Sequence, residues 1–155
     1  MAGELVVVGV DGSPQSIAAL HWAVRYGGAT GATVRAVRAW HYPAAVGPGP
    51  EGRAPREDTQ QVEQQQLEDL EITVSEAFPD GRPDNVETRA AFGHAAEALI
   101  EQSGDASLLV VGNKGRSAFS GMLLGSVSLH CVTGAACPVV VVRMPATHHQ
   151  QGWMS

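Results

Sequence analysis

The chain has 155 residues, which is the length of one domain and enough to bury a core without disulfides or metal ions. Hydrophobic residues make up 44% and charged residues 17% of the composition, which excludes an intrinsically disordered chain. The net charge of −6 argues against a general surface for nucleic acid or for anionic membranes.

The N-terminal sequence has no basic region followed by an apolar stretch and a cleavage site, and no window approaches a membrane span. Cys131 and Cys137 lack the CxxC spacing of a zinc site, and a domain of this length does not need a disulfide between them. We therefore predict a cytoplasmic protein with no metal site and no contact with a membrane.

The first part of the chain predicts a strand, a helix and a second strand. Leu5–Val10 is a continuous apolar run of the kind that is buried on both faces of a sheet. Ser13 can cap a helix and Pro14 suits its first turn, and we expect this helix to stop at Gly27-Gly28. Thr33–Trp40 is the second predicted strand.

The middle of the chain begins with a segment rich in proline and glycine, residues 43–58, which predicts a flexible loop. Thr59–Phe78 is expected to form a polar helix with one apolar stripe. Val86–Phe92 predicts a third strand, and residues 93–104 predict a short helix after it.

The last part of the chain predicts a strand, a helix and a final strand. Ser107–Asn113 is again mostly apolar, Ser126–Ala135 is helical in pattern, and Cys137–Arg143 contains four consecutive valines. The sequence therefore predicts a single domain over residues 1–145. Residues 146–155 show no pattern and are expected to form a disordered tail.

Strands that alternate with helices predict an α/β fold, in which a parallel sheet is covered by helices on both faces. In such folds ligands bind beyond the carboxyl ends of the strands, at the point where the strand order reverses. Asp11 and Gly112 directly follow two of the predicted strands and mark candidate positions for a site.

The segment between the fourth strand and the last helix is unusually long and rich in glycine. Gly112 and Gly115 follow the strand, and Gly125-Ser126 opens the helix. Glycine permits positive φ and lets backbone N–H groups approach a ligand, and a helix N-terminus attracts phosphates. The pattern is neither a Walker A loop nor a GxGxxG turn. Residue spacing alone leaves two interpretations open, a phosphate-binding loop and a flexible turn that ends in an ordinary cap.

The spacing Gly112-x2-Gly115-x9-Gly125-Ser126 resembles in full the nucleotide-binding signature of the universal stress protein family. The first strand with its turn and the closing "ACPVVVVR" also resemble that family, and the likeness covers about residues 4–143. It implies a three-layer sandwich around a five-stranded parallel sheet in the order 3-2-1-4-5, of the Rossmann-like type typical of adenine nucleotide α-hydrolases. It also implies ATP as the ligand and a homodimer that pairs through the last strand, Val139–Arg143.

The resemblance further implies a set of residues that surround the nucleotide, from the adenosine end to the phosphates. Asp11 would contact the adenosine, the backbone of Ala39 would read the adenine edge, and Gly112 would lie by the ribose. The phosphates would be surrounded by Gly115, Gly125, Ser126, Val127 and Ser128.

Three charged or titratable residues near the signature have no settled role. Lys114 and Arg116 could offset the charge of ATP together with a bound Mg²⁺, or they could be solvated loop residues. His94 stands where Asp is common in the family. None of these residues removes a backbone donor, so the expected site is unchanged.

Other functions fit the residues less well. A phospho-acceptor role for Asp11 would need a second carboxylate at the end of the third strand and a lysine after the fifth, and the chain has neither. The histidines do not have the spacing of a metal site. Because no residue is positioned as a general base, we expect at most slow ATP hydrolysis, in a regulatory module whose protein partner the sequence does not identify. The alternative is a structural or interaction dimer of the same fold that binds no nucleotide.

Overall fold

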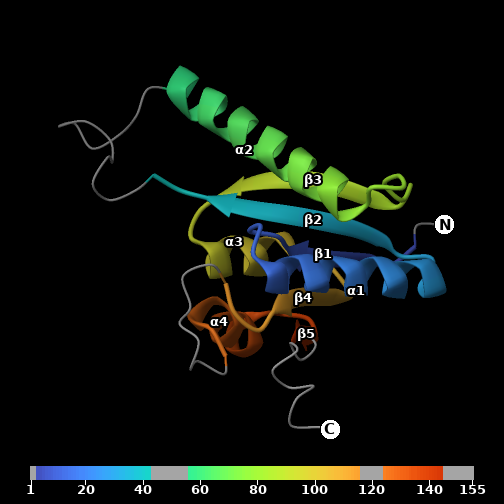
Figure 1. The fold of residues 1–155 in the computed structure, drawn as a ribbon. Coiled ribbons are helices and arrows are strands. Elements are labelled where there is room, and N and C mark those ends of the chain that lie inside the picture. The colour runs from blue at the N-terminus through green and yellow to red at the C-terminus, as the bar shows by residue number, and fades with distance from the viewer. Residues whose placement is uncertain (1–2, 43–55, 116–123, 145–155) are drawn as a thin grey trace, which may run out of the picture.

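The computed structural model describes residues 3–42, 56–115 and 124–144. Strands and helices alternate along these ranges, as the sequence predicts (Figure 1). In chain order the elements are β1 (Leu5–Gly9), α1 (Pro14–Thr30), β2 (Thr33–Trp40), α2 (Arg56–Ala77), β3 (Val86–Phe92), α3 (Ala95–Gln102), β4 (Leu108–Gly112), α4 (Ser126–Gly134) and β5 (Val139–Val142).

The strands form one five-stranded sheet in the order β3-β2-β1-β4-β5, and every neighbouring pair is parallel. The predicted fold class is therefore confirmed. The chain first winds outward from β1 to β3 and then returns to add β4 and β5 on the other side of β1 (Figure 1). The strand order reverses between β1 and β4, which makes the carboxyl ends of these two strands the expected place for a site.

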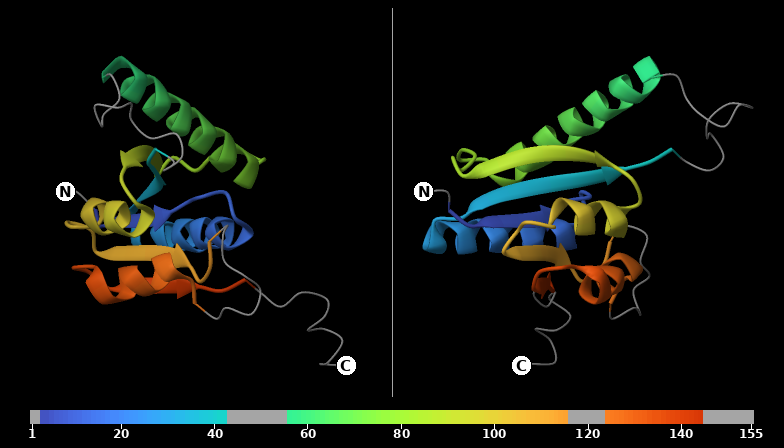
Figure 2. Two further views of the ribbon diagram at one scale, coloured as in Figure 1. Left: turned by 90° about the vertical axis from the view of Figure 1, so that its left-hand side faces the viewer. Right: turned by 180° about the vertical axis from the view of Figure 1, so that it is seen from behind.

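Helices cover both faces of the sheet, with α1 and α2 on one face and α3 and α4 on the other (Figure 2). Successive side chains of a strand point to opposite faces. Val6 and Val8 accordingly pack with the α1 and α2 side, whereas Val7 packs with the α3 and α4 side, and all three are fully buried. This double burial explains why the first strand is apolar at every position.

The helix boundaries differ from the prediction most at the end of α1 and the start of α2. Helix α1 does not stop at Gly27-Gly28 but continues to Thr30, where Gly31 adopts φ +79° and donates its N–H to the carbonyl of Gly27 at 2.8 Å. Gly27 is glycine because a Cβ there would lie 2.8 Å from Nδ2 of Asn85, so this glycine serves packing and does not end the helix. Helix α2 starts at Arg56, three residues before the predicted start.

Several predictions fall on parts of the chain outside the described ranges. These are residues 43–55 of the expected flexible loop and the expected tail at 146–155. Strand β5 is an edge strand whose four valines are half-buried. The homodimer through Val139–Arg143 stays a prediction. No helix within the described ranges is both long and apolar enough to cross a membrane.

Cys131 is fully buried among the residues that pack under α3 and α4, and burial raises the pKa of its thiol from 9.0 to about 11. The folded protein therefore holds this proton more tightly than the unfolded chain does. The resulting stability is complete below pH 9 and is lost as the pH rises toward 11. A shift of this size corresponds to about 2 kcal/mol of unfolding free energy between pH 8 and pH 11.

Urea unfolding of the wild type and Cys131→Ala at pH 8 and pH 11 tests this effect. The wild type should lose about 2 kcal/mol more than the variant over this interval, because the variant has no buried thiol to titrate. Cys137→Ala is the matched control, since it removes a cysteine that is only half-buried, and it should behave like the wild type. An equal loss in the wild type and Cys131→Ala would contradict the assignment.

Candidate functional site

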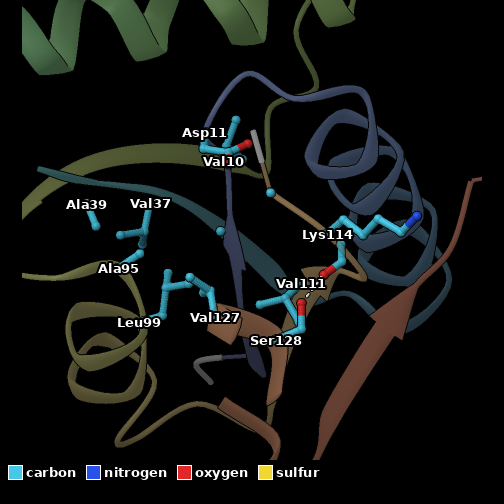
Figure 3. Close-up of a pocket in the computed structure, with 13 residues that line it drawn as sticks. Val10, Asp11, Val37, Ala39, Ala95, Leu99, Val111, Lys114, Val127 and Ser128 are labelled. Carbon is cyan, nitrogen blue, oxygen red and sulfur yellow. Dashed lines mark hydrogen bonds between the residues drawn. The ribbon is translucent and has the colours of Figure 1, made fainter. Parts of the chain in front are cut away.

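A cleft lies at the carboxyl ends of β1 and β4, where the strand order reverses (Figure 3). It is open to solvent, and its cavity volume is about 80 Å³. All of the predicted site residues line it except Gly125 and Ser126, which sit where α4 begins beside it. The lining residues are Gly9, Val10, Asp11, Val37, Ala39, Ala95, Leu99, Val111, Gly112, Lys114, Gly115, Val127 and Ser128.

The cleft is apolar at one side and polar at the other. Figure 3 shows Val37, Ala39, Ala95 and Leu99 gathered on one side and Lys114 on the opposite side. The apolar wall was not predicted, apart from Ala39. Its signal was present in the alternation of β2, which places Val37 and Ala39 on one face, and in the spacing of one helical turn between Ala95 and Leu99.

Asp11 belongs to a tight turn that caps helix α1. Its Oδ1 accepts the N–H of Ser13 at 2.9 Å, and the hydroxyl oxygen of Ser13 accepts the N–H of Ser16 at 3.2 Å. The hydroxyl of Ser16 accepts the N–H of Asp11 at 3.2 Å. The N-terminus of α1 is therefore capped by side chains of its own turn. The other carboxylate oxygen of Asp11 faces Gly115, where a Cβ would lie only 3.1 Å from it.

Helix α4 begins differently, because its N-cap is Gly125, which has no side chain to offer. The N–H of Gly125 itself donates to the carbonyl of Asn113 at 2.7 Å. The first N–H groups of a helix have no partner within the helix, so the first turn of α4 carries uncapped donors and a partial positive charge. Val127 and Ser128 of this turn line the cleft, which places the positive end of α4 beside it.

Ser128 joins helix α4 to strand β4. The side chain is buried, and its Oγ donates to the carbonyl of Gly112 at 2.5 Å, which ties the first turn of α4 to the end of β4. The proton of this hydroxyl is therefore used inside the protein. The N–H groups of the α4 turn are left as the donors that can face an anion.

Among the signature glycines, Gly112 serves close packing. Glycine permits positive φ, but Gly112, Gly115 and Gly125 are not among the glycines that adopt it in the described chain. A Cβ on Gly112 would lie 2.8 Å from the backbone carbonyl of Gln15, so Gly112 lets helix α1 pack directly on the end of β4. A Cβ on Gly125 would come within 3.4 Å of the Lys114 backbone.

The remaining candidates are placed as follows. Lys114 lines the polar side of the cleft, and Arg116 lies outside the described ranges. His94 is the N-cap of α3, directly before Ala95 of the apolar wall. Among the described residues no three His, Cys, Asp or Glu side chains come together as potential ligands of a metal ion.

A parallel sheet in the order 3-2-1-4-5, with a cleft at the reversal of that order, defines a doubly wound α/β domain of the Rossmann-like type. The chain belongs to the universal stress protein family, because the model of that family matches residues 4–143. The resemblance seen in the sequence is thereby confirmed.

Curated universal stress proteins are similar to the chain over most of its length. The chain is 34% identical over 138 residues to a universal stress protein of Mycolicibacterium smegmatis, covering 89% of this chain and 45% of the relative. It is 35% identical over 145 residues to universal stress protein Rv1996 of Mycobacterium tuberculosis, covering 90% and 44%. The chain thus spans about half the length of these curated relatives. A solved universal stress protein in complex with cAMP superimposes with a TM-score of 0.59 at 29% identity, covering 92% of this chain and 98% of that one.

Proposed function

We propose that this chain binds an adenine nucleotide, ATP with Mg²⁺, in the cleft between β1 and β4, and acts as a nucleotide-dependent regulatory module. The observation that carries the proposal is the uncapped N-terminus of α4, which borders a cleft that also has an apolar wall. A nucleotide has the same polarity, with a flat apolar base at one end and a polyanion at the other. The cAMP complex of a relative that is 29% identical supports an adenine nucleotide as the ligand.

The proposal assigns each end of the nucleotide to one side of the cleft. The phosphates meet the first turn of α4 and the backbone at Gly115, on the side of the cleft that Lys114 lines. The base meets the apolar wall near Ala39 and Ala95, and Asp11 lies between the two ends as an acceptor for the ribose hydroxyls. The acidic character of the whole chain makes Mg²⁺ important for offsetting the charge of ATP.

We further propose that hydrolysis at this site is slow. Asp11 is the one carboxylate among the described lining residues, which include no histidine, and its Oδ1 is occupied by the N–H of Ser13. A general base has to lie beside the attacking water at the phosphates, whereas Asp11 is assigned to the ribose. The module would therefore respond to nucleotide by being occupied, without rapid turnover.

Calorimetric titration with Mg-ATP tests the proposed site. The wild type should bind, and Asp11→Ala should bind about tenfold more weakly, because it loses a charged hydrogen-bond acceptor. Asp105→Ala is the matched control, since this exposed carboxylate lies before β4, at the far end of the sheet, and it should bind like the wild type. Circular dichroism confirms that Asp11→Ala is folded, since this variant also loses the acceptor for Ser13.

Equal heats in the wild type and Asp11→Ala would show that the site is placed wrongly. A purified wild type that has no adenine absorbance and releases no heat with Mg-ATP would instead favour the alternative, an interaction module of the same fold without nucleotide.

A further inference from the structure

Two histidines lie together beyond the carboxyl ends of β2 and β3, next to residues of the apolar wall. The rings of His41 and His94 are 4.4 Å apart between centroids and inclined by 47°. His41 directly follows the end of β2, two residues beyond Ala39, and His94 directly precedes Ala95. Since Ala39 and Ala95 both line the cleft, the imidazole pair adjoins two residues of the apolar wall.

A hydrogen bond at one ring nitrogen fixes the orientation of the His41 ring. Its Nδ1 lies 3.1 Å from the carbonyl oxygen of Tyr42. A carbonyl can only accept a hydrogen bond, so Nδ1 carries the proton and donates it. In the neutral ring the opposite nitrogen, Nε2, is then an acceptor with its lone pair available.

His94 supplies the second ring, and it lies at the start of helix α3. Gly93 donates its N–H to the carbonyl of Trp40 at 2.8 Å, and its φ of +136° turns the chain from β3 into α3. His94 then occupies the N-cap position, where side chains commonly accept an N–H of the first turn. Its side chain makes no such bond and packs against the His41 ring.

We propose that His41 is a specificity-determining residue of the nucleotide site, which accepts the exocyclic amine of a 6-aminopurine at Nε2, and that His94 is its positioning residue. This inference rests on the proposed function. A 6-oxopurine presents an acceptor at the same position, and two acceptors facing each other repel. The pair therefore selects adenine over hypoxanthine or guanine at the base end of the cleft.

Parallel titrations with Mg-ATP and Mg-ITP test this proposal, because inosine triphosphate replaces the 6-amine by oxygen and leaves the ribose and phosphates unchanged. The wild type should prefer ATP. In His41→Ala, binding of ATP should weaken about tenfold, whereas ITP should bind as before or more tightly. His41→Gln, whose amide oxygen can replace Nε2 as an acceptor, should retain part of the preference. His130→Ala, an exposed histidine on α4, should leave both affinities unchanged.

The ratio of ATP to ITP affinity in His94 variants tests the positioning role of His94. His94→Ala should reduce the ratio of ATP to ITP affinity, and His94→Phe should keep it, since a planar ring is enough to hold His41. An unchanged ratio in His41→Ala, with ATP still bound, would overturn this inference and leave the proposed function standing. A wild type that binds neither nucleotide would overturn both.

Discussion

Gly112→Ala is expected to lower the free energy of unfolding by about 1–3 kcal/mol, which is the usual cost of overpacking a buried position. The added Cβ would lie 2.8 Å from the backbone carbonyl carbon and oxygen of Gln15 and from its Cβ. These are backbone and near-backbone atoms of a capped helix start, and they cannot move aside as the tip of a flexible side chain can. Thermal unfolding followed by circular dichroism should show a melting temperature lower by roughly 5 °C.

Gly28→Ala provides the matched control for this prediction. Gly28 lies in α1, is exposed, and a Cβ there would meet nothing within 4 Å. Alanine is favoured over glycine inside a helix by about 1 kcal/mol, so this variant should be more stable than the wild type. If both substitutions changed the stability in the same direction, the close packing of Gly112 on Gln15 would not be the reason for that glycine.

Ser126→Asp is expected to stabilise the protein and to weaken Mg-ATP binding at least about tenfold, which corresponds to about 1.4 kcal/mol. Ser126 is the exposed first residue of α4, so a carboxylate there interacts favourably with the helix N-terminus by about 0.3–1 kcal/mol. The same carboxylate competes with the phosphates for the uncapped N–H groups and repels them. Urea unfolding and calorimetry on the same sample measure the two opposite changes.

Ser126→Ala distinguishes phosphate binding by the backbone N–H groups from phosphate binding by the Ser126 hydroxyl. If main-chain N–H groups bind the phosphates, loss of this hydroxyl should change the Mg-ATP affinity by no more than about threefold. A loss in Ser126→Ala as large as that in Ser126→Asp would mean that the side chain is the ligand. Tighter binding in Ser126→Asp would contradict an anion site at the start of α4.

The secondary structure could be predicted because the strands β1 and β4 lie in the middle of the sheet and are buried on both faces. Double burial demands an uninterrupted apolar run, which is visible in Leu5–Val10 and in residues 107–113. The strand order could not be predicted in this way, because residue patterns fix which segments are strands but not which strands are neighbours. The order was predicted from the family signature, and the sheet confirms it.

Only part of the site could be predicted from the sequence. The glycine spacing identifies a loop, but the reason for each glycine depends on contacts that are distant in the chain. Gly112 packs on Gln15, and Gly115 lies beside Asp11. The pairing of His41 with His94 likewise follows from the neighbouring ends of β2 and β3 and from the turn at Gly93, so the sequence does not reveal that these two histidines meet.

The affinities of adenosine, AMP, ADP and Mg-ATP for the wild-type protein test the central claim most directly. If the uncapped turn of α4 and the backbone at Gly115 bind a polyanion, affinity should rise with each phosphate, and ATP should exceed adenosine by at least about tenfold. This gain should shrink in Ser126→Asp. Adenosine binding as tightly as ATP in the wild type would contradict the claim, since the polar end of the cleft would then contribute nothing.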